Sequence, residues 1–202
     1  MERESEERTG VSRKEAILMA ATELFAQRGY GATPTSDIAQ AAGVAEGTLF
    51  HHFKTKEGIL AYIVKDMLDD YVQGIEMQAE KASNGLEAIK GVICFHFRFI
   101  NERSGEVMVM LRDFPFHLME EDTPFREIVS SRFFHLVNLF KGLIETGQKD
   151  GSIRRISAEK TAFILIGMLN GLGRQTLMCP LKIPDIYQEV LDFCYNSLAK
   201  RG

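Results

Sequence analysis

The 202-residue sequence has little cysteine and no apolar run long enough to cross a membrane. A membrane-spanning helix needs about 18 consecutive apolar residues, so we expect no association with a bilayer. The three cysteines, Cys94, Cys179 and Cys194, form no CxxC pair and no even disulfide framework, which favours a reduced, cytoplasmic compartment. The first ten residues, MERESEERTG, are too charged for a secretory signal and predict a flexible arm.

The sequence also lacks the excess positive charge that is typical of proteins that bind nucleic acids. The net charge is −4, and residues 11–60 hold five basic and five acidic side chains, which sum to zero. Charge alone therefore gives no reason to expect DNA binding. Any such interpretation must depend on where particular groups lie.

Signatures of common enzyme classes are absent as well. The chain holds no GxSxG, HExxH or GxxxxGK[ST] motif, and GLG at 171–173 lacks the third glycine of a dinucleotide-binding fingerprint. The run HLMEED at 117–122 contains metal-ligating residue types, but an acidic, solvated loop explains it more simply. We therefore expect no catalytic residue, no metal and no cofactor. A helical carrier or hydrolase that does not bind DNA is the alternative function.

Helical periodicity dominates the chain, and hairpin signals are absent. Ser12 and Glu15 predict a capping box at the first helix, and Thr35 or Ser36 is expected to cap the second. The pattern predicts an all-α protein with a compact short-helix part up to about residue 54 and a long-helix remainder. The expected helices, about nine in number, lie near 12–29, 36–42, 46–52, 56–81, 85–102, 124–149, 158–178 and 185–199, with a broken segment at 104–122.

Two short helices joined by a tight glycine turn, at 36–42 and 46–52, describe a helix-turn-helix. Gly43 can adopt a left-handed backbone conformation without steric cost, and the small Ala39 lets two helices cross closely. Leu49 is expected to pack inward. The N-terminal end of the second helix of such a motif enters the major groove of DNA, where small residues allow the backbone to approach the duplex.

Small and hydrogen-bonding residues cover the side of the second helix that faces away from the predicted core. Thr48 can hydrogen-bond a base edge or contact a thymine methyl group. Thr35 and Ser36 at one helix N-terminus, and Lys56 at another, suit phosphates through backbone N–H groups, the helix dipole and charge. A three-helix packing unit that binds no nucleic acid is the alternative interpretation of the same residues.

The run TPTSDIAQAAGVAEGTLFHHFKTKEGIL, preceded by AATELFAQRGY, resembles the tetracycline-repressor (TetR) family of transcriptional regulators. The family pattern continues through residues 13–60 almost without gaps, and the rest of the chain matches only in helical layout and length. The resemblance implies a homodimer with a DNA-binding domain at 11–54, after an arm at 1–10, and a ligand-binding and dimerisation domain at 55–202. It implies a regulator, most often a repressor, that a small molecule releases from a palindromic DNA operator.

Two residues depart from the family pattern. Ala45 replaces the usual serine at the start of the recognition helix, and Phe50 replaces a tyrosine that can contact phosphate. His52 matches the family's histidine, so the resemblance gives a phosphate role to His52 first and to His51 second. The predicted DNA-binding residues are Thr35, Ser36, Ala45, Glu46, Gly47, Thr48, Phe50, His51, His52 and Lys56.

The run VICFHFRFI at 92–100 has two interpretations. His96 and Arg98 can be the polar anchors of an apolar ligand cavity, or a satisfied histidine and a paired arginine in a buried helix. The first interpretation predicts a largely apolar effector with a polar or anionic group, and the broken segment at 104–122 can supply its entrance. The candidate ligand-binding residues are Phe95, His96, Arg98, Phe99, Arg112, Phe114, Phe116 and His117.

The run AFILIGMLNGLGRQTL is apolar on more than one face and contains three glycines. Glycine weakens a helix by about 1 kcal/mol relative to alanine, so several glycines indicate close approach of another backbone. With YQEVLDFCYNSL, the run predicts a four-helix dimer interface built from two helices per subunit, and a helix of the intrachain core is the alternative. The predicted interface residues are Gly167, Asn170, Gly171, Arg174, Leu191 and Tyr195.

Overall fold

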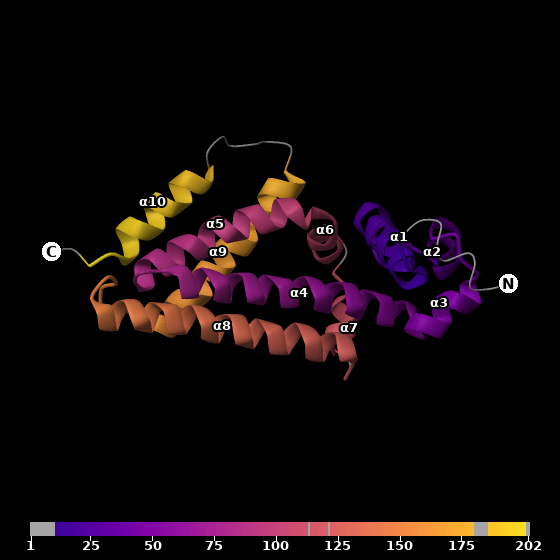
Figure 1. The fold of residues 1–202 in the computed structure, drawn as a ribbon, viewed down its shortest axis with the longest axis horizontal. Coiled ribbons are helices and arrows are strands. Elements are labelled where there is room, and N and C mark those ends of the chain that lie inside the picture. The colour runs from indigo at the N-terminus through magenta and orange to yellow at the C-terminus, as the bar shows by residue number, and fades with distance from the viewer. Residues whose placement is uncertain (1–10, 113, 121, 180–185, 201–202) are drawn as a thin grey trace. The chain divides into compact units, whose positions relative to one another are not determined.

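The computed structural model describes residues 11–112, 114–120, 122–179 and 186–200. Over these residues the chain is helical, with one isolated antiparallel bridge between Ile153 and Ala199 (Figure 1). None of the described helices is both long and apolar enough to span a membrane. The helices are α1 (Arg13–Arg28), α2 (Thr35–Ala41), α3 (Glu46–Phe53), α4 (Lys56–Lys81), α5 (Gly85–Glu102), α6 (Ser104–Arg112), α7 (Phe116–Glu120), α8 (Pro124–Asp150), α9 (Ala158–Met178) and α10 (Ile186–Leu198).

The all-α fold class is confirmed, and the described residues form ten helices rather than the expected nine. The difference arises in the segment 104–122, which forms two short helices, α6 and α7. Pro115 stands directly before α7, and proline suits the start of a helix because it has no backbone N–H to donate. The predicted arm at 1–10 lies outside the described residues.

The capping box at the start of α1 is confirmed. The Glu15 N–H donates to Ser12 Oγ at 3.2 Å, and the Ser12 N–H donates to the Glu15 carboxylate at 2.8 Å. These hydrogen bonds hold the pKa of Glu15 below its usual range. Asn84 and Ser157 cap α5 and α9, since their side-chain oxygens accept from backbone N–H groups in the first turn of each helix.

The expected cap of α2 by Thr35 or Ser36 is wrong. The helix begins at Thr35 itself, and the N-cap is Pro34, which makes no side-chain hydrogen bond. The Thr35 hydroxyl is engaged elsewhere, because it donates to Glu46 at the start of α3. Pro34 already holds the extended conformation that an N-cap requires, with φ −70° and ψ 153°.

The described chain packs as two units, each with its own core. The first unit contains the described part of Met1–Met67 together with Gly105–Val129, and α1, α2 and α3 pack against one another within it. The second contains Leu68–Ser104 and the described part of Ser130–Gly202. Its central helix is α5, which packs against both α9 and α10 (Figure 1). The predicted division into a DNA-binding domain at 11–54 and a ligand-binding and dimerisation domain at 55–202 stays a prediction.

Gly85 and Gly74, both in the second unit, lie where a side chain does not fit. A Cβ atom at Gly85 would overlap the backbone of Gly147, and a Cβ atom at Gly74 would overlap the Phe95 ring. The start of α5 is also fixed by the turn after α8, since the Gly85 N–H donates to the Asp150 carboxylate at 2.8 Å. These contacts place α5, and the aromatic residues that it carries, against α4 and α8.

Candidate nucleic-acid interface

The turn between α2 and α3 has the geometry of a helix-turn-helix. Gly43 has φ +66°, a left-handed conformation that strains any residue with a side chain. Its N–H donates to Gln40 O at 3.1 Å, and the Val44 N–H donates to Ala39 O at 3.0 Å. Ala39 is 3% exposed, so its small side chain lies where the two helices meet.

The two sides of α3 differ as the sequence predicts. Leu49 and Phe53 are buried with Ile38 of α2 in the core of the first unit. Thr48 is partly exposed. The opposite side has no large aliphatic residue, and its exposed residues are Ala45, Glu46, Gly47, Phe50, His51 and His52.

A hydrogen bond joins the N-terminal ends of α2 and α3. Thr35 Oγ1 donates to Glu46 Oε1 at 2.6 Å. Ala45, at the N-cap of α3, has no side chain that could cap the helix. Close by in the sequence, Arg28 pairs with Asp37 at 2.8 Å, so one acid of α2 is already neutralised.

Basic groups follow α3 directly. Lys54 ends the helix in a positive-φ conformation, at φ 65°, and its ammonium group donates to His51 O at 3.2 Å. The Lys56 ammonium group lies 4.4 Å from the centre of the Tyr30 ring. Burial, together with the negative charge of Glu57, raises the pKa of Tyr30, so the ring stays neutral beneath the lysine.

The predicted ligand-binding residues divide between the two packing units. Phe95, His96 and Phe99 are buried in α5, within the second unit. The members from the first unit are not buried: Arg112, Phe116 and His117 are exposed, and Phe114 is partly exposed.

His96 is the polar centre of an aromatic cluster made by Tyr71, Phe95, His96 and Phe99. Its Nδ1 lies 2.8 Å from the Tyr71 hydroxyl, and its Nε2 lies 3.0 Å from Leu169 O. A neutral ring that carries its proton on Nε2 donates to the carbonyl and accepts from the hydroxyl, so both nitrogens are satisfied. Burial lowers the pKa of His96 to about 4, although the bond to Leu169 opposes this shift.

Arg98 lies outside this cluster. Its side chain is 60% exposed, its Nε lies 3.8 Å from a Glu102 carboxylate oxygen, and its guanidinium group lies 5.6 Å from the centre of the Phe95 ring. These contacts match the interpretation of a satisfied histidine and a paired arginine. A role for either residue in effector binding stays a prediction.

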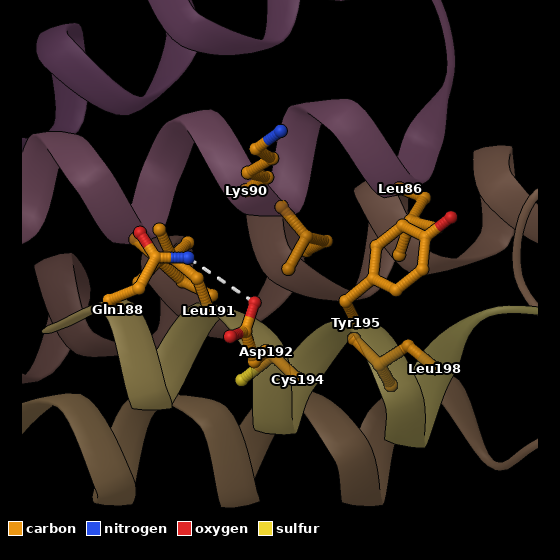
Figure 2. Close-up of a pocket in the computed structure, with 10 residues that line it drawn as sticks. Leu86, Lys90, Gln188, Leu191, Asp192, Cys194, Tyr195 and Leu198 are labelled. Carbon is orange, nitrogen blue, oxygen red and sulfur yellow. Dashed lines mark hydrogen bonds between the residues drawn. The ribbon is translucent and has the colours of Figure 1, made fainter.

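A shallow pocket of about 120 Å³ lies between α5 and α10 (Figure 2). Leucine and isoleucine side chains form much of its lining, with Lys90 on α5 and Tyr195 on α10 among its polar members. Gln188 donates to Asp192 at 3.3 Å along α10, as the dashed line in Figure 2 shows. Sites for small molecules usually measure about 300–1,000 Å³, so this pocket is too small to enclose a large apolar effector.

Most of the predicted dimer-interface residues lie on the surface of the chain. Gly167, Asn170, Gly171 and Arg174 are exposed along α9, and Tyr195 is exposed on α10. Leu191 is buried, so it belongs to the core of the second unit within one chain. Large apolar side chains on the same two helices are exposed, namely Phe163, Ile164, Met178, Tyr187 and Phe193.

Sequence reasoning missed Tyr71 and the pairing of Thr35 with Glu46. Tyr71 lies 25 positions before His96, and no local pattern marks which aromatic residue of one helix meets a histidine of the next. The two members of the other pair are 11 positions apart on different helices. The sequence places each residue on a helix but does not show that they touch.

The fold and the exposed face of α3 define the class: this is a helix-turn-helix protein built entirely of helices over its described residues. Residues 17–63 match the family described as "Bacterial regulatory proteins, tetR family". The chain is 32% identical over 143 residues to the HTH-type transcriptional repressor KstR2 of Mycolicibacterium smegmatis, which covers 71% of this chain and 68% of that protein. The chain belongs to the TetR family, and it is therefore a DNA-binding transcriptional regulator and not an enzyme.

Two further likenesses extend beyond the helix-turn-helix. The fatty acid metabolism regulator protein of Bacillus subtilis is 27% identical over 139 residues, which is 68% of this chain and 69% of that protein. The structure of the ketosteroid transcriptional regulator KstR2 of Mycobacterium tuberculosis superposes with a TM-score of 0.78 at 23% identity, and it covers 94% of this chain and 96% of that one. The second likeness shows a shared fold across nearly the whole chain.

Proposed function

We propose that this regulator is a repressor that binds a palindromic operator as a homodimer and releases it when a small, largely apolar effector binds. The observation that supports this most directly is the helix-turn-helix at α2 and α3, with an exposed face of small and polar residues at the N-terminal end of α3. The M. smegmatis relative is named a repressor, which supports repression over activation. Residues 11–54 form the proposed DNA-binding domain, and residues 55–202 bind the effector and the second subunit.

The proposed contacts with DNA have two roles. Gly47 and Ala45 let the α3 backbone approach the major groove, and Thr48 contacts a base edge. Contacts with phosphate position the protein without reading sequence. We assign that second role to Ser36, His51, His52 and Lys56, and Phe50 packs on a sugar or a thymine methyl group.

Two relatives carry names that bear on the effector. One is named a ketosteroid regulator and the other a regulator of fatty acid metabolism, and steroids and fatty acids both have a large apolar body. The cluster of Tyr71, Phe95, His96 and Phe99 offers an aromatic wall with a polar pair at its centre. Phe95, His96 and Phe99 are buried, so an effector of this class binds by displacing rings within the second unit.

The purified protein is expected to enrich a palindromic site from random duplexes, with half-sites read about 34–36 Å apart or slightly more. Affinity should fall steeply with salt, because Lys56 and its neighbours displace counterions from the phosphates. Lys56→Ala should weaken all duplexes about equally and lower the salt slope by about 1. Quantitative binding of labelled duplexes at several salt concentrations measures both effects.

The same labelled site then tests effector release. A long-chain fatty acid and a steroid carboxylic acid are expected to release the duplex, and acetate should not. If no site is enriched at any salt concentration, the proposed DNA contacts are wrong. If a site is enriched but neither apolar acid releases it, the effector class is wrong and the DNA contacts stand.

The proposed dimer interface is the exposed stripe of α9 together with α10. Phe163, Ile164 and Phe193 are 46%, 66% and 64% exposed, and large apolar patches of this kind mark interaction sites. Gly167 and Gly171 have open space where a Cβ atom would stand, so packing within one chain does not require glycine there. A second backbone that approaches closely explains both glycines.

Replacing Gly171 with leucine is expected to weaken the dimer by roughly a hundredfold, because the side chain would separate two packed helices. The single chain should keep its fold, since nothing within 4 Å meets a Cβ atom at this position. Sedimentation over a range of protein concentrations measures the dissociation constant. A wild-type protein that sediments as a monomer, or a variant whose dimer is as tight as the wild type, would contradict this interface.

A further inference from the structure

The first turn of α3 places a carboxylate on the face that the proposed function assigns to the duplex. Glu46 is exposed and precedes Gly47 and Thr48. DNA phosphates repel a carboxylate, so an acid in this position lowers the affinity for every sequence unless it meets a donor on a base edge. The chemistry of the base edges shows which donor suits it.

Cytosine is the base whose major-groove edge fits a carboxylate. An ionised carboxylate only accepts hydrogen bonds. Guanine presents two acceptors, thymine presents an acceptor and a methyl group, and adenine places the N7 acceptor beside its N6 donor. Cytosine presents the N4 donor alone, so it is the only base that offers a carboxylate a hydrogen bond with no adjacent acceptor of its own.

Thr35 fixes the direction of this carboxylate. Its Oγ1 donates to Glu46 Oε1 at 2.6 Å, across the gap between the N-terminal ends of α2 and α3. The hydroxyl group has a single proton, so while it donates to Glu46 it cannot also donate to a phosphate. The other carboxylate oxygen, Oε2, can then accept from a base.

We propose that Glu46 is a specificity-determining residue that accepts a hydrogen bond from N4 of a cytosine in each half-site, and that Thr35 is its positioning residue. This inference rests on the proposed function, because it requires α3 to enter the major groove. It gives the Thr35 hydroxyl group a role of its own, beside the phosphate contact that the sequence predicted through the N–H groups of this helix end. It also explains why a regulator whose DNA-binding segment has no net charge carries an acid at the start of its recognition helix.

Selection from random duplexes with the wild type, Glu46→Gln and Glu46→Ala tests the reading of cytosine. The wild type should enrich cytosine at one position of each half-site, and replacing that base should cost about tenfold in affinity. Glu46→Gln should enrich adenine at the same position, because an amide pairs with adenine N6 and N7. Glu46→Ala should accept any base there, and all three proteins should agree at every other position.

The outcomes distinguish a failure of the Glu46 inference from a failure of the proposed function. If the wild type enriches a site and Glu46→Gln enriches the same bases at every position, Glu46 does not read a base and the inference is wrong. If the wild type enriches no site at all, the proposed function fails and this inference fails with it. Thermal unfolding of each variant should match the wild type, because Glu46 is exposed.

A pair of Thr35 variants tests the positioning role. Thr35→Val keeps the shape of the side chain and removes the hydroxyl group, so it should reduce the roughly tenfold preference for cytosine. Its affinity for a site that lacks the cytosine should stay unchanged. Thr35→Ser keeps the hydroxyl group and should keep the preference. If Thr35→Val instead weakens every duplex by the same factor, Thr35 contacts phosphate and does not position Glu46.

Discussion

Acidification from pH 6.5 to pH 4 is expected to lower the free energy of unfolding of the wild type by about 3 kcal/mol more than that of His96→Gln. His96 is 4% exposed, and burial lowers its pKa from 6.5 to about 4. Between pH 6.5 and pH 4, His96 is largely protonated in the unfolded chain and largely neutral in the folded chain. The contribution of neutral His96 to the free energy of unfolding is therefore fully present above pH 6.5, and it is lost as the pH falls through the folded pKa.

Glutamine is the matched replacement because its amide can donate to Leu169 O and accept from the Tyr71 hydroxyl without ionising. Urea unfolding at a fixed protein concentration, repeated from pH 7 to pH 4, measures the difference between the two proteins. Protonation of carboxylates with a lowered pKa, such as Glu15 and Asp150, also lowers the free energy of unfolding in acid. Both proteins contain these carboxylates, so their effect cancels in the difference between the wild type and His96→Gln. If the free energy of unfolding falls equally with pH in both proteins, His96 is not held neutral in the folded chain.

His96→Leu separates the hydrogen bonds from the titration. Leucine fills the space but leaves the Tyr71 hydroxyl without its partner, which costs about 1–3 kcal/mol at every pH. This variant should therefore be less stable than His96→Gln at pH 7, and it should show the same weak dependence on pH. The cluster joins α4 to α5, and His96 also bonds to Leu169 O of α9, so the loss of His96 should also change the response to effector.

Local signals in the sequence predict the helices well, because each helix start depends on residues that are close in sequence. The capping box of Ser12 with Glu15 and the cap of α5 by Asn84 depend on atoms three positions apart. The one wrong cap, at α2, has a non-local cause. Thr35 has a partner 11 positions away that no periodicity indicates.

The face of α3 is predictable for the same reason as its helix. Leu49 and Phe53 are four positions apart, so they lie on one side of α3 and leave the other side exposed. The surroundings of His96, in contrast, depend on how separate helices pack against one another. His96 satisfies its ring nitrogens with residues 25 and 73 positions away, and the sequence alone does not distinguish this arrangement from a cavity with His96 as its anchor.

The fold of the chain gives no reason for a glycine at position 47. A Cβ atom at Gly47 meets nothing within 4 Å, and Gly47 lies in the first turn of a helix with an ordinary conformation. Glycine costs a helix about 1 kcal/mol relative to alanine. Gly47→Ala should therefore stabilise the folded protein slightly, and Gly47→Leu should leave it at least as stable as the wild type. The space that glycine keeps open is the space that the proposed function gives to the DNA backbone and base edges.

Binding to the selected operator should change in the opposite direction. Gly47→Ala is expected to weaken it by roughly tenfold and Gly47→Leu by roughly a hundredfold, because each added group occupies the interface and holds α3 away from the groove. Gly142→Ala is the matched control, since it replaces a second helical glycine whose Cβ position is open and which lies on α8. It should give a similar gain in thermal stability with unchanged operator affinity. If Gly47→Leu binds the operator as tightly as Gly142→Ala does, α3 does not approach the duplex through its N-terminal turn. A drop in affinity confined to the Gly47 variants, with stability unchanged or raised, would locate the DNA contact at the start of α3.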